Sequence, residues 1–490
     1  MGQQNVPATQ IWTLPTVGPP TTNVLLQGVG FDPLTAIDIY FDDSVLASTT
    51  TDTNGSFGQG VITATGATWT QLQVPATALP GQHTITAQEH VGQKSAQKPF
   101  LVRTDWPQFQ FSPDHTGVNP YENILSPDNV GGLGVRWSYL GIRAFTPTVA
   151  GGILYMSSRD DMSLYAFDAG TGTFLWKYGP TGYWVSSTPA VANGVVYFFS
   201  DDGSLYALNS TTGALLWSYA TGFGGSSPAV AKGAVYFLSS DGYLYALNAT
   251  TGELLWRYPT GGPSRSTPAV VNGVVYVGSY DHNVYALDAN TGALLWKYAT
   301  GDSVYSSPSV VNRVVYVGSF DHNVYALDAN TGALLWKYAT GDLVFPSPAV
   351  ANGVVYIGSD DYNLYALNAS TGELIWRYAT GSWMECQPAV ANGVVYFGSW
   401  DNNWYALNAR TGALLWQYNI GFVGTGQVVA DGVLYSGAYG RDYNQGGVYA
   451  FDLSRSSSPD KLNPPARPEP ISLLPDWKLQ PSPAVTSNKK

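Results

Sequence analysis

Eight tryptophans recur at spacings of 39 to 41 residues through most of the chain. They are Trp137, Trp176, Trp217, Trp256, Trp296, Trp336, Trp376 and Trp416. The stretches 273–302 and 313–342 differ at only two of thirty positions, which indicates duplication of one structural unit. The tryptophan period is therefore a structural period.

Each unit contains four apolar runs of strand length, separated by turn residues. In the unit from Thr267 to Tyr298 these runs are Pro268–Val271, Val274–Ser279, Val284–Asp288 and Ala293–Tyr298. No segment shows a sustained helical period, and a 40-residue repeat of four strands is typical of a propeller blade. Eight such units predict an all-β protein with one eight-bladed β-propeller of four-stranded blades.

The two ends of the repeat region complete each other. The last unit stops at Asp452 without its tryptophan strand, whereas Gly134–Tyr139 carries Trp137 with no hairpin before it. We expect Gly134–Tyr139 to pair beside Val448–Asp452, because ring closure removes unpaired sheet edges. The eight tryptophans then pack between blades, and burying each indole contributes at most roughly 4–6 kcal/mol.

The residues on either side of the repeats predict two further regions. Short β-type runs cut by Gly, Pro and Asn-Gly turns predict a small β-sandwich over residues 21–103. We expect a flexible segment over residues 1–20 and a connector over 104–133. The propeller then spans 134–453, and the Pro- and Ser-rich residues 454–490 form a tail.

Composition excludes several classes of protein. The net charge is −12 and no Lys/Arg cluster interrupts the acidic balance, so nucleic acid is not an expected partner. No run approaches the roughly 18 apolar residues of a membrane helix, and no signal peptide is visible. Few lysines among abundant Tyr, Trp, Thr and Asn favour an extracellular, periplasmic or cell-surface location. Cys386 is the only cysteine, so a disulfide within the chain and a thiolate metal cage are excluded.

The repeat carries a family resemblance. The pattern Ala286-x-Asp288-x-x-Thr291-Gly292-x-x-x-Trp296 resembles the tryptophan-docking motif of PQQ-type eight-bladed propellers, and seven units carry it with Asp or Asn in the third place. The segment Asp105-Trp106-Pro107-Gln108-Phe109 resembles the lead-in of quinoprotein dehydrogenases. Upstream, Gly28-Val29-Gly30-Phe31 with Asn54-Gly55-Ser56-Phe57 resembles bacterial immunoglobulin-like modules.

The resemblance implies a fold but leaves two functions open. The family includes PQQ-dependent dehydrogenases and non-catalytic members such as the BamB-type outer-membrane assembly propellers. The alcohol-oxidising members have an adjacent cysteine pair beneath the quinone and a calcium ion, and Cys386 alone cannot form that pair. We therefore expect a non-catalytic binding or scaffolding protein without a cofactor. The alternative is a dehydrogenase that oxidises an alcohol or sugar with PQQ and calcium in the central channel.

One face of the predicted ring varies while the framework repeats. It carries the turns between second and third strands and the connections between blades. One connection position should line the mouth of the central channel, and it reads Ala144, Ser186, Gly225, Arg265, Tyr305, Phe345, Glu385 and Gly424. The surrounding aromatic residues are Trp184, Phe223, Trp383 and Phe422, with Tyr280, Phe320, Tyr362 and Trp400 farther out.

Aromatic side chains with a few polar groups suit a carbohydrate, a peptide or a protein partner, although the same residues could merely plug the channel. We expect a ligand off the ring axis, with a polar group on Arg265 and an apolar face against Tyr305 and Phe345. Glu385 would accept a hydrogen bond or supply one cation ligand. His282 and His322 occupy equivalent turns of different blades, so we expect solvated turn residues and no metal site.

Overall fold

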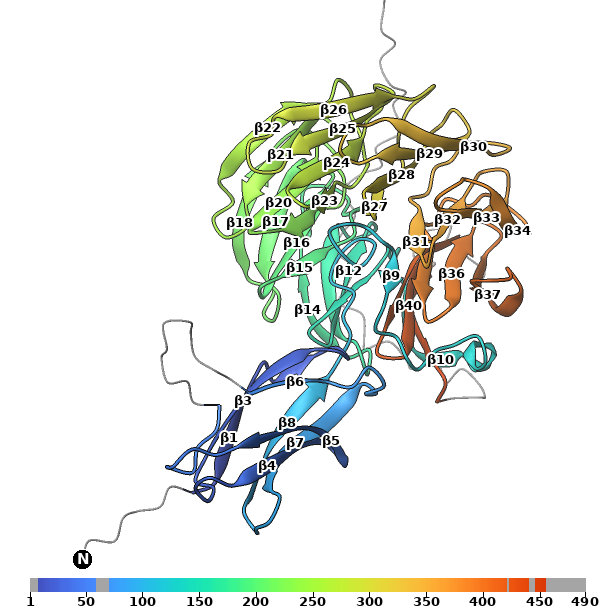
Figure 1. Ribbon diagram of the computed structural model, residues 1–490. Helices are drawn as coiled ribbons and strands as arrows, with labels where there is room; N and C mark the ends of the chain where they lie inside the picture. Colours follow the sequence, from blue (N-terminus) through green and yellow to red (C-terminus); the bar gives the residue numbers. More distant parts are fainter. Residues whose placement is uncertain (1–7, 59–69, 421–422, 440–445, 455–490) are drawn as a thin grey trace, which may run out of the picture.

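The computed structural model describes residues 8–58, 70–420, 423–439 and 446–454 of the chain. A pair of β-sheets near the N-terminus is followed by a ring of β-sheets (Figure 1). Helical structure in these residues is limited to one 3₁₀ turn, η1 (Val130–Gly132). The all-β fold class is confirmed.

The N-terminal region contains a three-stranded sheet of order β1-β3-β6 and a five-stranded sheet of order β2-β8-β7-β4-β5. Their strands are β1 (Gln10–Leu14), β2 (Val17–Gly18), β3 (Asn23–Val29), β4 (Ala36–Phe41), β5 (Ser44–Thr50), β6 (Thr70–Gln73), β7 (Gly81–Glu89) and β8 (Ser95–Val102). Alternate residues of the long strands enter a shared core that includes Val24, Ile39, Ile85 and Phe100. This alternation follows because each sheet buries one face.

The prediction of a flexible segment over residues 1–20 is wrong from residue 10 onward. β1 pairs with β3 from Gln10↔Val29 to Leu14↔Leu25, and Ile11 is buried in the core. The run is short and Pro15 follows it, so its strand character depends on tertiary pairing that local patterning does not show. Phe57 forms an isolated bridge with Gly28, and residues 59–69 lie outside the described residues.

Eight antiparallel sheets form the ring, which confirms the predicted eight blades. Seven blades use four consecutive strands, and the eighth combines β39, β40 and β41 with the distant β10. The first four blades are β11 (Thr148–Ala150), β12 (Ile153–Ser158), β13 (Ser163–Asp168), β14 (Phe174–Tyr178); β15 (Ala190–Ala192), β16 (Val195–Ser200), β17 (Ser204–Asn209), β18 (Leu215–Ala220); β19 (Ala229–Ala231), β20 (Ala234–Leu238), β21 (Tyr243–Asn248), β22 (Leu254–Pro259); and β23 (Ala269–Val271), β24 (Val274–Gly278), β25 (Asn283–Asp288), β26 (Leu294–Ala299). The last four are β27 (Ser309–Val311), β28 (Val314–Gly318), β29 (Asn323–Asp328), β30 (Leu334–Ala339); β31 (Ala349–Ala351), β32 (Val354–Gly358), β33 (Asn363–Asn368), β34 (Leu374–Ala379); β35 (Ala389–Ala391), β36 (Val394–Ser399), β37 (Asn403–Asn408), β38 (Leu414–Asn419); and β39 (Val423–Ala430), β40 (Val433–Tyr439), β41 (Gly446–Asp452), β10 (Gly134–Leu140).

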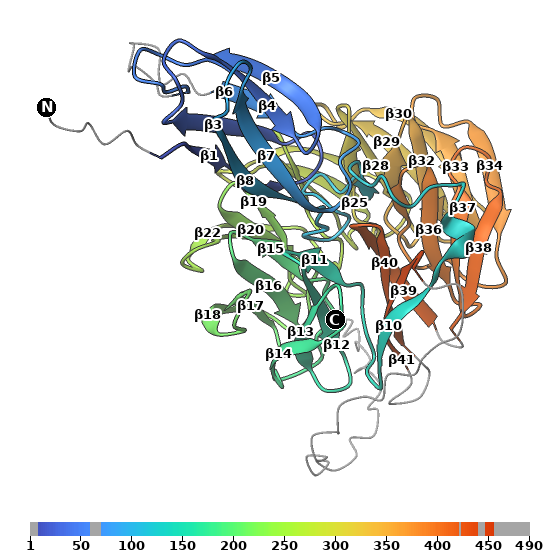
Figure 2. The same ribbon diagram turned by 90° about the horizontal axis from the view of Figure 1, so that it is seen from below.

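The ring is closed by the strand that precedes the first blade. β10 pairs antiparallel with β41, from Gly134↔Asp452 to Leu140↔Gly447. Figure 2 shows β10 beside β41, between the first and seventh blades. Joining the two ends of the repeat region in one sheet leaves neither end as an open edge.

Each outer-strand tryptophan docks on the next blade. Trp296 Nε1 donates to Ala329 O at 2.9 Å, and a Cβ on Gly332 would lie 2.6 Å from the indole. Gly332 also has a φ of +72°, so both its conformation and its contact require glycine. Equivalent Nε1 bonds are made by all eight tryptophans, and Trp416 donates to Leu133 O just before β10.

A lead-in segment, residues 106–119, runs around the inside of the ring. We call it the strap. The middle valines of seven inner strands donate their backbone N–H groups to the strap, six of them to carbonyls and Val230 to the Gln108 side chain. Val191, Val310 and Val390, for example, donate to the carbonyls of Pro107, Asp114 and Gly117 at 2.7, 2.9 and 2.8 Å. The strap ends in β9 (Val118–Asn119), which adds to the seventh blade in parallel with β35. It thereby satisfies backbone donors that face the ring axis.

The N-terminal sheets meet the ring on one face. The Asp431 carboxylate, in the hairpin between β39 and β40, accepts from Thr104 N at 2.6 Å, and Asp431 N donates to Thr104 Oγ1 at 2.8 Å. Gly151 N, in the hairpin between β11 and β12, donates to Asp105 Oδ1 at 3.2 Å. The face with the hairpins between first and second strands, here called the hairpin face, therefore carries the N-terminal sheets (Figure 1).

Candidate binding face

The opposite face of the ring carries the turns between second and third strands and the connections between blades. We call it the turn face. Chain direction reverses at every strand of an antiparallel blade, so these two sets of segments meet on one side. Four of the large aromatic side chains that are exposed in the ring lie here, and they are Tyr183, Phe223, Tyr362 and Trp383.

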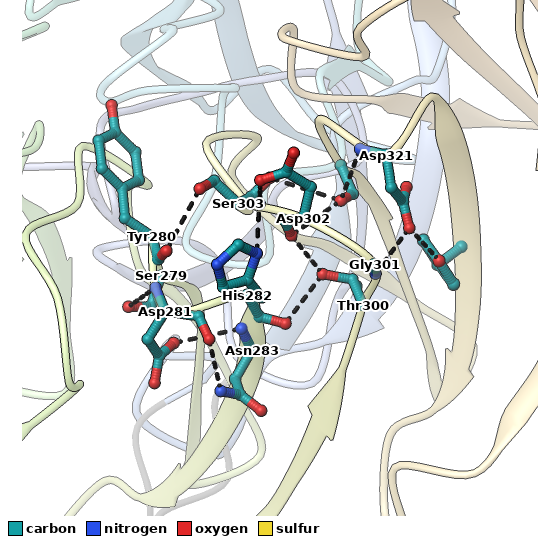
Figure 3. Close-up of polar contacts among 12 residues, drawn as sticks. Ser279, Tyr280, Asp281, His282, Asn283, Thr300, Gly301, Asp302, Ser303 and Asp321 are labelled. Carbon is teal, nitrogen blue, oxygen red and sulfur yellow. Dashed lines mark hydrogen bonds and ion pairs between the residues drawn. The ribbon is translucent and has the colours of Figure 1, made fainter.

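The segment between the fourth and fifth blades shows how the turn face is held (Figure 3). Thr300 Oγ1 donates to His282 O at 2.9 Å, which ties the connection to the turn before it. Gly301 N donates to Asp321 Oδ2 at 2.7 Å, which ties the same connection to the turn after it. The side chain of Tyr280 points away from this polar network. The framework thus fixes the backbone and leaves the mouth-facing side chains to vary.

His282 and His322 occupy equivalent places in two of these turns. Their side chains are half exposed, and each ring faces an aspartate of the following connection. The distances are 3.4 Å from His282 Nδ1 to Asp302 Oδ1 and 3.9 Å from His322 Nε2 to Asp342 Oδ1. Each histidine has a positive φ that the turn requires, so both belong to the turn framework.

Turn residues and connection residues alternate around the mouth of the channel. The Tyr305 ring centroid lies 5.7 Å from Tyr280 in the preceding turn and 6.1 Å from Phe320 in the following turn. The Glu385 carboxylate also contacts the following turn, where it accepts a hydrogen bond from the Trp400 side chain. We call the series the mouth ring, and its members are Asp160, Ser186, Asp201, Gly225, Ser240, Arg265, Tyr280, Tyr305, Phe320, Phe345, Asp360, Glu385 and Trp400.

Aromatic side chains fill one sector of the mouth ring. Tyr305 and Phe345 stack with ring centroids 4.0 Å apart and an interplanar angle of 27°. Phe320 stacks on the same pair, 5.9 Å from Phe345. Burial raises the pKa of the Tyr305 hydroxyl, and the charge of Arg265 opposes that effect. Tyr305 and Phe345, which were predicted to contact a ligand, therefore stack on each other.

Arg265 lies beside this stack and faces a carboxylate of its own chain. Its Nη2 is 3.8 Å from Asp201 Oδ1, and Ser186 Oγ donates to Asp201 Oδ2 at 2.9 Å. The Asp201 side chain is only 4% exposed, whereas the Arg265 side chain is 44% exposed. The sequence analysis did not identify this pairing, which crosses the part of the mouth ring around Gly225.

An acidic sector follows the aromatic stack. Asp360 Oδ1 is buried without a hydrogen-bond partner. Burial raises the pKa of Asp360 to about 7, and the charges of Glu385, Asp342 and Asp361 add to the rise. Burial also raises the pKa of Glu385, which the hydrogen bond with Trp400 opposes. Two carboxyl groups of the mouth ring are therefore held together in a setting that disfavours their charge.

Two tryptophans border the acidic sector. Trp383 is 46% exposed and meets Trp400 edge to face, with ring centroids 5.9 Å apart. Trp184, predicted as a further ligand contact, lies elsewhere on the turn face. The guanidinium carbon of Arg159 lies over it, 3.7 Å from the Trp184 ring centroid. Trp383 and Trp400 thus belong with Glu385, and Trp184 belongs to a separate cluster. Phe422 lies outside the described residues.

Neither Cys386 nor His115 has the properties of a catalytic group. Burial raises the pKa of the Cys386 thiol, and the neighbouring charge of Glu385 adds to the rise, so the thiol is protonated at neutral pH. His115 is buried in the strap, where Nδ1 bonds to Pro308 O at 3.1 Å and burial lowers its pKa to about 3. These groups sit apart from each other, one beneath the mouth ring and one inside the strap.

The described residues of the mouth ring offer few carboxylate ligands for a calcium ion and no open slot between Tyr305 and Phe345 for a quinone. Calcium takes six to eight oxygen ligands, and no group of three or more His, Cys, Asp or Glu that could hold a metal occurs among the described residues. A planar quinone needs a slot between two flat groups, whereas Tyr305 and Phe345 already lie in contact.

Comparison with known proteins supports the assignment of the repeat. The family model described as outer membrane protein assembly factor BamB matches residues 132–269 and 321–421. The matched residues cover blades on both sides of the ring. The ring is a PQQ-like β-propeller.

Solved structures share the fold of this PQQ-like propeller at low sequence identity. BamB from Moraxella catarrhalis is 20% identical with a TM-score of 0.57, over 66% of this chain and 98% of that one. A europium-containing methanol dehydrogenase is 16% identical with a TM-score of 0.61, over 71% and 98%. The quinohemoprotein alcohol dehydrogenase ADHIIG from Pseudomonas putida HK5 is 18% identical with a TM-score of 0.64, over 74% and 82%.

These likenesses show the fold of the PQQ-like propeller, and they include both assembly factors and dehydrogenases. No curated protein matches the chain. The family match does not reach the N-terminal sheets, so their resemblance to immunoglobulin-like modules stays a prediction. None of the described residues forms a helix long and apolar enough to cross a membrane.

Proposed function

We propose that the chain is a non-catalytic binding or scaffolding protein that uses its turn face and mouth ring to hold a peptide, carbohydrate or protein partner. The observation that carries the proposal is the pairing of exposed aromatic side chains with a few polar groups on one face. Tyr362 and Trp383, 45% and 46% exposed, are two residues along the chain from Asp360 and Glu385. Such a mixture is typical of recognition surfaces.

The strap supports a binding role over turnover in the channel. It bonds to seven inner strands and therefore occupies part of the space inside the ring. A partner that rests across the turn face needs no passage through the ring. The relatives named as assembly factors show that the fold can serve without a reaction, and we propose a location outside the cytoplasm for this chain as well.

The experiment is a screen of peptide and glycan arrays, followed by titration of each hit against mouth variants. Arg265→Ala should weaken binding by about 1.5–3 kcal/mol, the range for a hydrogen bond to a charged group. Arg313→Gly, in a hairpin on the opposite face, is the matched control and should bind as the wild type does. Equal binding by wild type and a folded Arg265→Ala/Tyr305→Ala variant would place the working surface elsewhere.

The second candidate is a PQQ-dependent dehydrogenase that oxidises an alcohol or sugar. Structures of two such dehydrogenase classes share the fold, which is the observation in its favour. When bound, the quinone would supply the electron acceptor for substrate oxidation. The absent cysteine pair and the stacked rings of Tyr305 and Phe345 count against it.

A further inference from the structure

We propose that the outer face of the N-terminal sheet β1-β3-β6 binds an uncharged polysaccharide chain, with Trp12 as the platform for one sugar ring. This face is separate from the mouth ring, so the inference goes beyond the proposed function. It is carried by the exposure of Trp12, by the amide side chains beside it and by the lack of charged residues in the three strands.

The alternation along the three strands decides which side chains point outward. Ile11, Val24, Leu26 and Leu72 are buried in the core that the two N-terminal sheets share. Because successive side chains of a strand point to opposite faces, the intervening residues lie on the outer face. The outer face therefore carries one indole, two leucines and three glutamine amides. These residues are Trp12, Leu14, Leu25, Gln27, Gln71 and Gln73.

The strand register places apolar and amide side chains next to each other. Trp12 pairs with Gln27 across β1 and β3, and Leu14 pairs with Leu25. Leu25 in turn pairs with Gln71 across β3 and β6. Trp12 is 43% exposed and Leu14 is 61% exposed. Since directly opposed side chains of antiparallel strands have their Cβ atoms about 5 Å apart, these groups form one continuous surface.

The charge of this face indicates a neutral partner. No Asp, Glu, Lys, Arg or His occurs in β1, β3 or β6, although the whole chain has a net charge of −12. The other N-terminal sheet differs, because Asp38 faces His90 at 2.7 Å and Asp42 faces His83 at 2.6 Å. An ionic ligand on the uncharged face would lose water without meeting an opposite charge, whereas a neutral ligand has no such cost.

The size of the face favours a saccharide chain over a second copy of the protein. Three strands about 4.8 Å apart and five residues long cover roughly 250 Å². A stable protein interface buries about 800 Å² on each partner. A sugar ring can pack its apolar side on an indole, and glutamine amides both donate and accept hydrogen bonds, as the hydroxyl groups of a sugar do.

The position of the face gives the N-terminal sheets a role of their own. They join the ring on the hairpin face, where Thr104 bonds to Asp431, and the mouth ring lies on the opposite face. A polysaccharide on the sheet would leave the turn face open to a different partner. The N-terminal sheets would then attach the propeller to a glycan surface.

The test is isothermal titration of the full chain with neutral and acidic oligosaccharides. The neutral probes are cellohexaose, N-acetylated chitohexaose, maltohexaose and xylohexaose, and the acidic probe is hexagalacturonate. We expect saturable binding of at least one neutral probe and at least tenfold weaker binding of the acidic probe.

Trp12→Ala should weaken binding of that neutral probe at least tenfold, whereas Trp12→Phe keeps a flat ring and should retain most of the affinity. Gln27→Ala/Gln71→Ala should weaken binding at least threefold. The control is Val91→Ala, which truncates an exposed residue in the turn between β7 and β8 and should change affinity less than twofold. Circular dichroism and thermal unfolding establish that each variant is folded.

Two results would overturn the inference: no binding of any of the four neutral probes, and unchanged affinity in a folded Trp12→Ala variant. A dimer of the full chain that dissociates in Trp12→Ala, without glycan binding, would assign the face to a second copy instead. Glycan binding that persists in Trp12→Ala and is lost in Arg265→Ala/Tyr305→Ala would reject this site and support the proposed function. Array hits that depend on Trp12 but ignore every mouth variant would reject the proposed function and support this site.

Discussion

Replacing Asp360 by asparagine should stabilise the protein at pH 8, because the native carboxylate is held where its charge is disfavoured. The ordinary pKa of the group is 3.8 and the fold raises it to about 7. A carboxyl group whose pKa is raised on folding makes its full contribution to the stability of the folded protein below pH 3.8. That contribution is lost as the pH rises through 7, because the folded protein must then bury the charged form. A pKa difference of about three corresponds to about 4 kcal/mol of folding free energy, which partial exposure and screening reduce to about 1–2 kcal/mol.

The assay is urea unfolding of wild type and Asp360→Asn at pH 4 and pH 8. The variant should gain about 1–2 kcal/mol at pH 8 and little at pH 4, since the native carboxyl is protonated there. Asp201→Asn is the comparison, because its carboxylate accepts from Ser186 at 2.9 Å and faces Arg265. It should lose about 1 kcal/mol at pH 8. A variant Asp360→Asn that is destabilised at pH 8 would refute the reasoning.

Three further predictions concern the scaffold. Trp296→Phe removes the indole N–H that bonds to Ala329 O and should lower the free energy of unfolding by about 2 kcal/mol in urea titrations. Arg313 has a φ of +66°, so Arg313→Gly should raise the unfolding temperature through about 0.5–1 kcal/mol, and a drop would contradict the strain argument. Burial lowers the pKa of His115 to about 3, so the folded protein keeps this side chain neutral. The free energy of unfolding should therefore fall on acidification below pH 6.5, by about 2 kcal/mol between pH 7 and pH 5. His115→Gln should flatten that loss.

The blades and the mouth ring could be predicted from the sequence because ring symmetry converts a repeat position into a place in space. The 40-residue period gives the number of blades, and Trp137 without a hairpin gives the closing strand. Arg265, Tyr305, Phe345 and Glu385 share one repeat position, so their order around the mouth follows from the chain order. Local hairpins need no information from distant residues.

Contacts that cross several blades could not be predicted in this way. Arg265 faces Asp201 over the small residues between them, and nothing in either repeat marks the pair. The strap bonds to inner strands up to about 270 residues away, for example Val390 N to Gly117 O, through backbone atoms that carry no sequence signal. The stack of Tyr305 on Phe345 likewise depends on side-chain rotation, which a repeat position leaves open.

The most direct test of the central claim is reconstitution of the purified chain with PQQ and calcium. Dye-linked oxidation of alcohols and sugars is then measured beside titration of a ligand found on the arrays. A non-catalytic binding propeller predicts saturable ligand binding that weakens in Arg265→Ala and no dye reduction above a quinone-only control. Dye reduction that requires the protein and disappears when the quinone is removed would contradict the claim and make the chain a dehydrogenase.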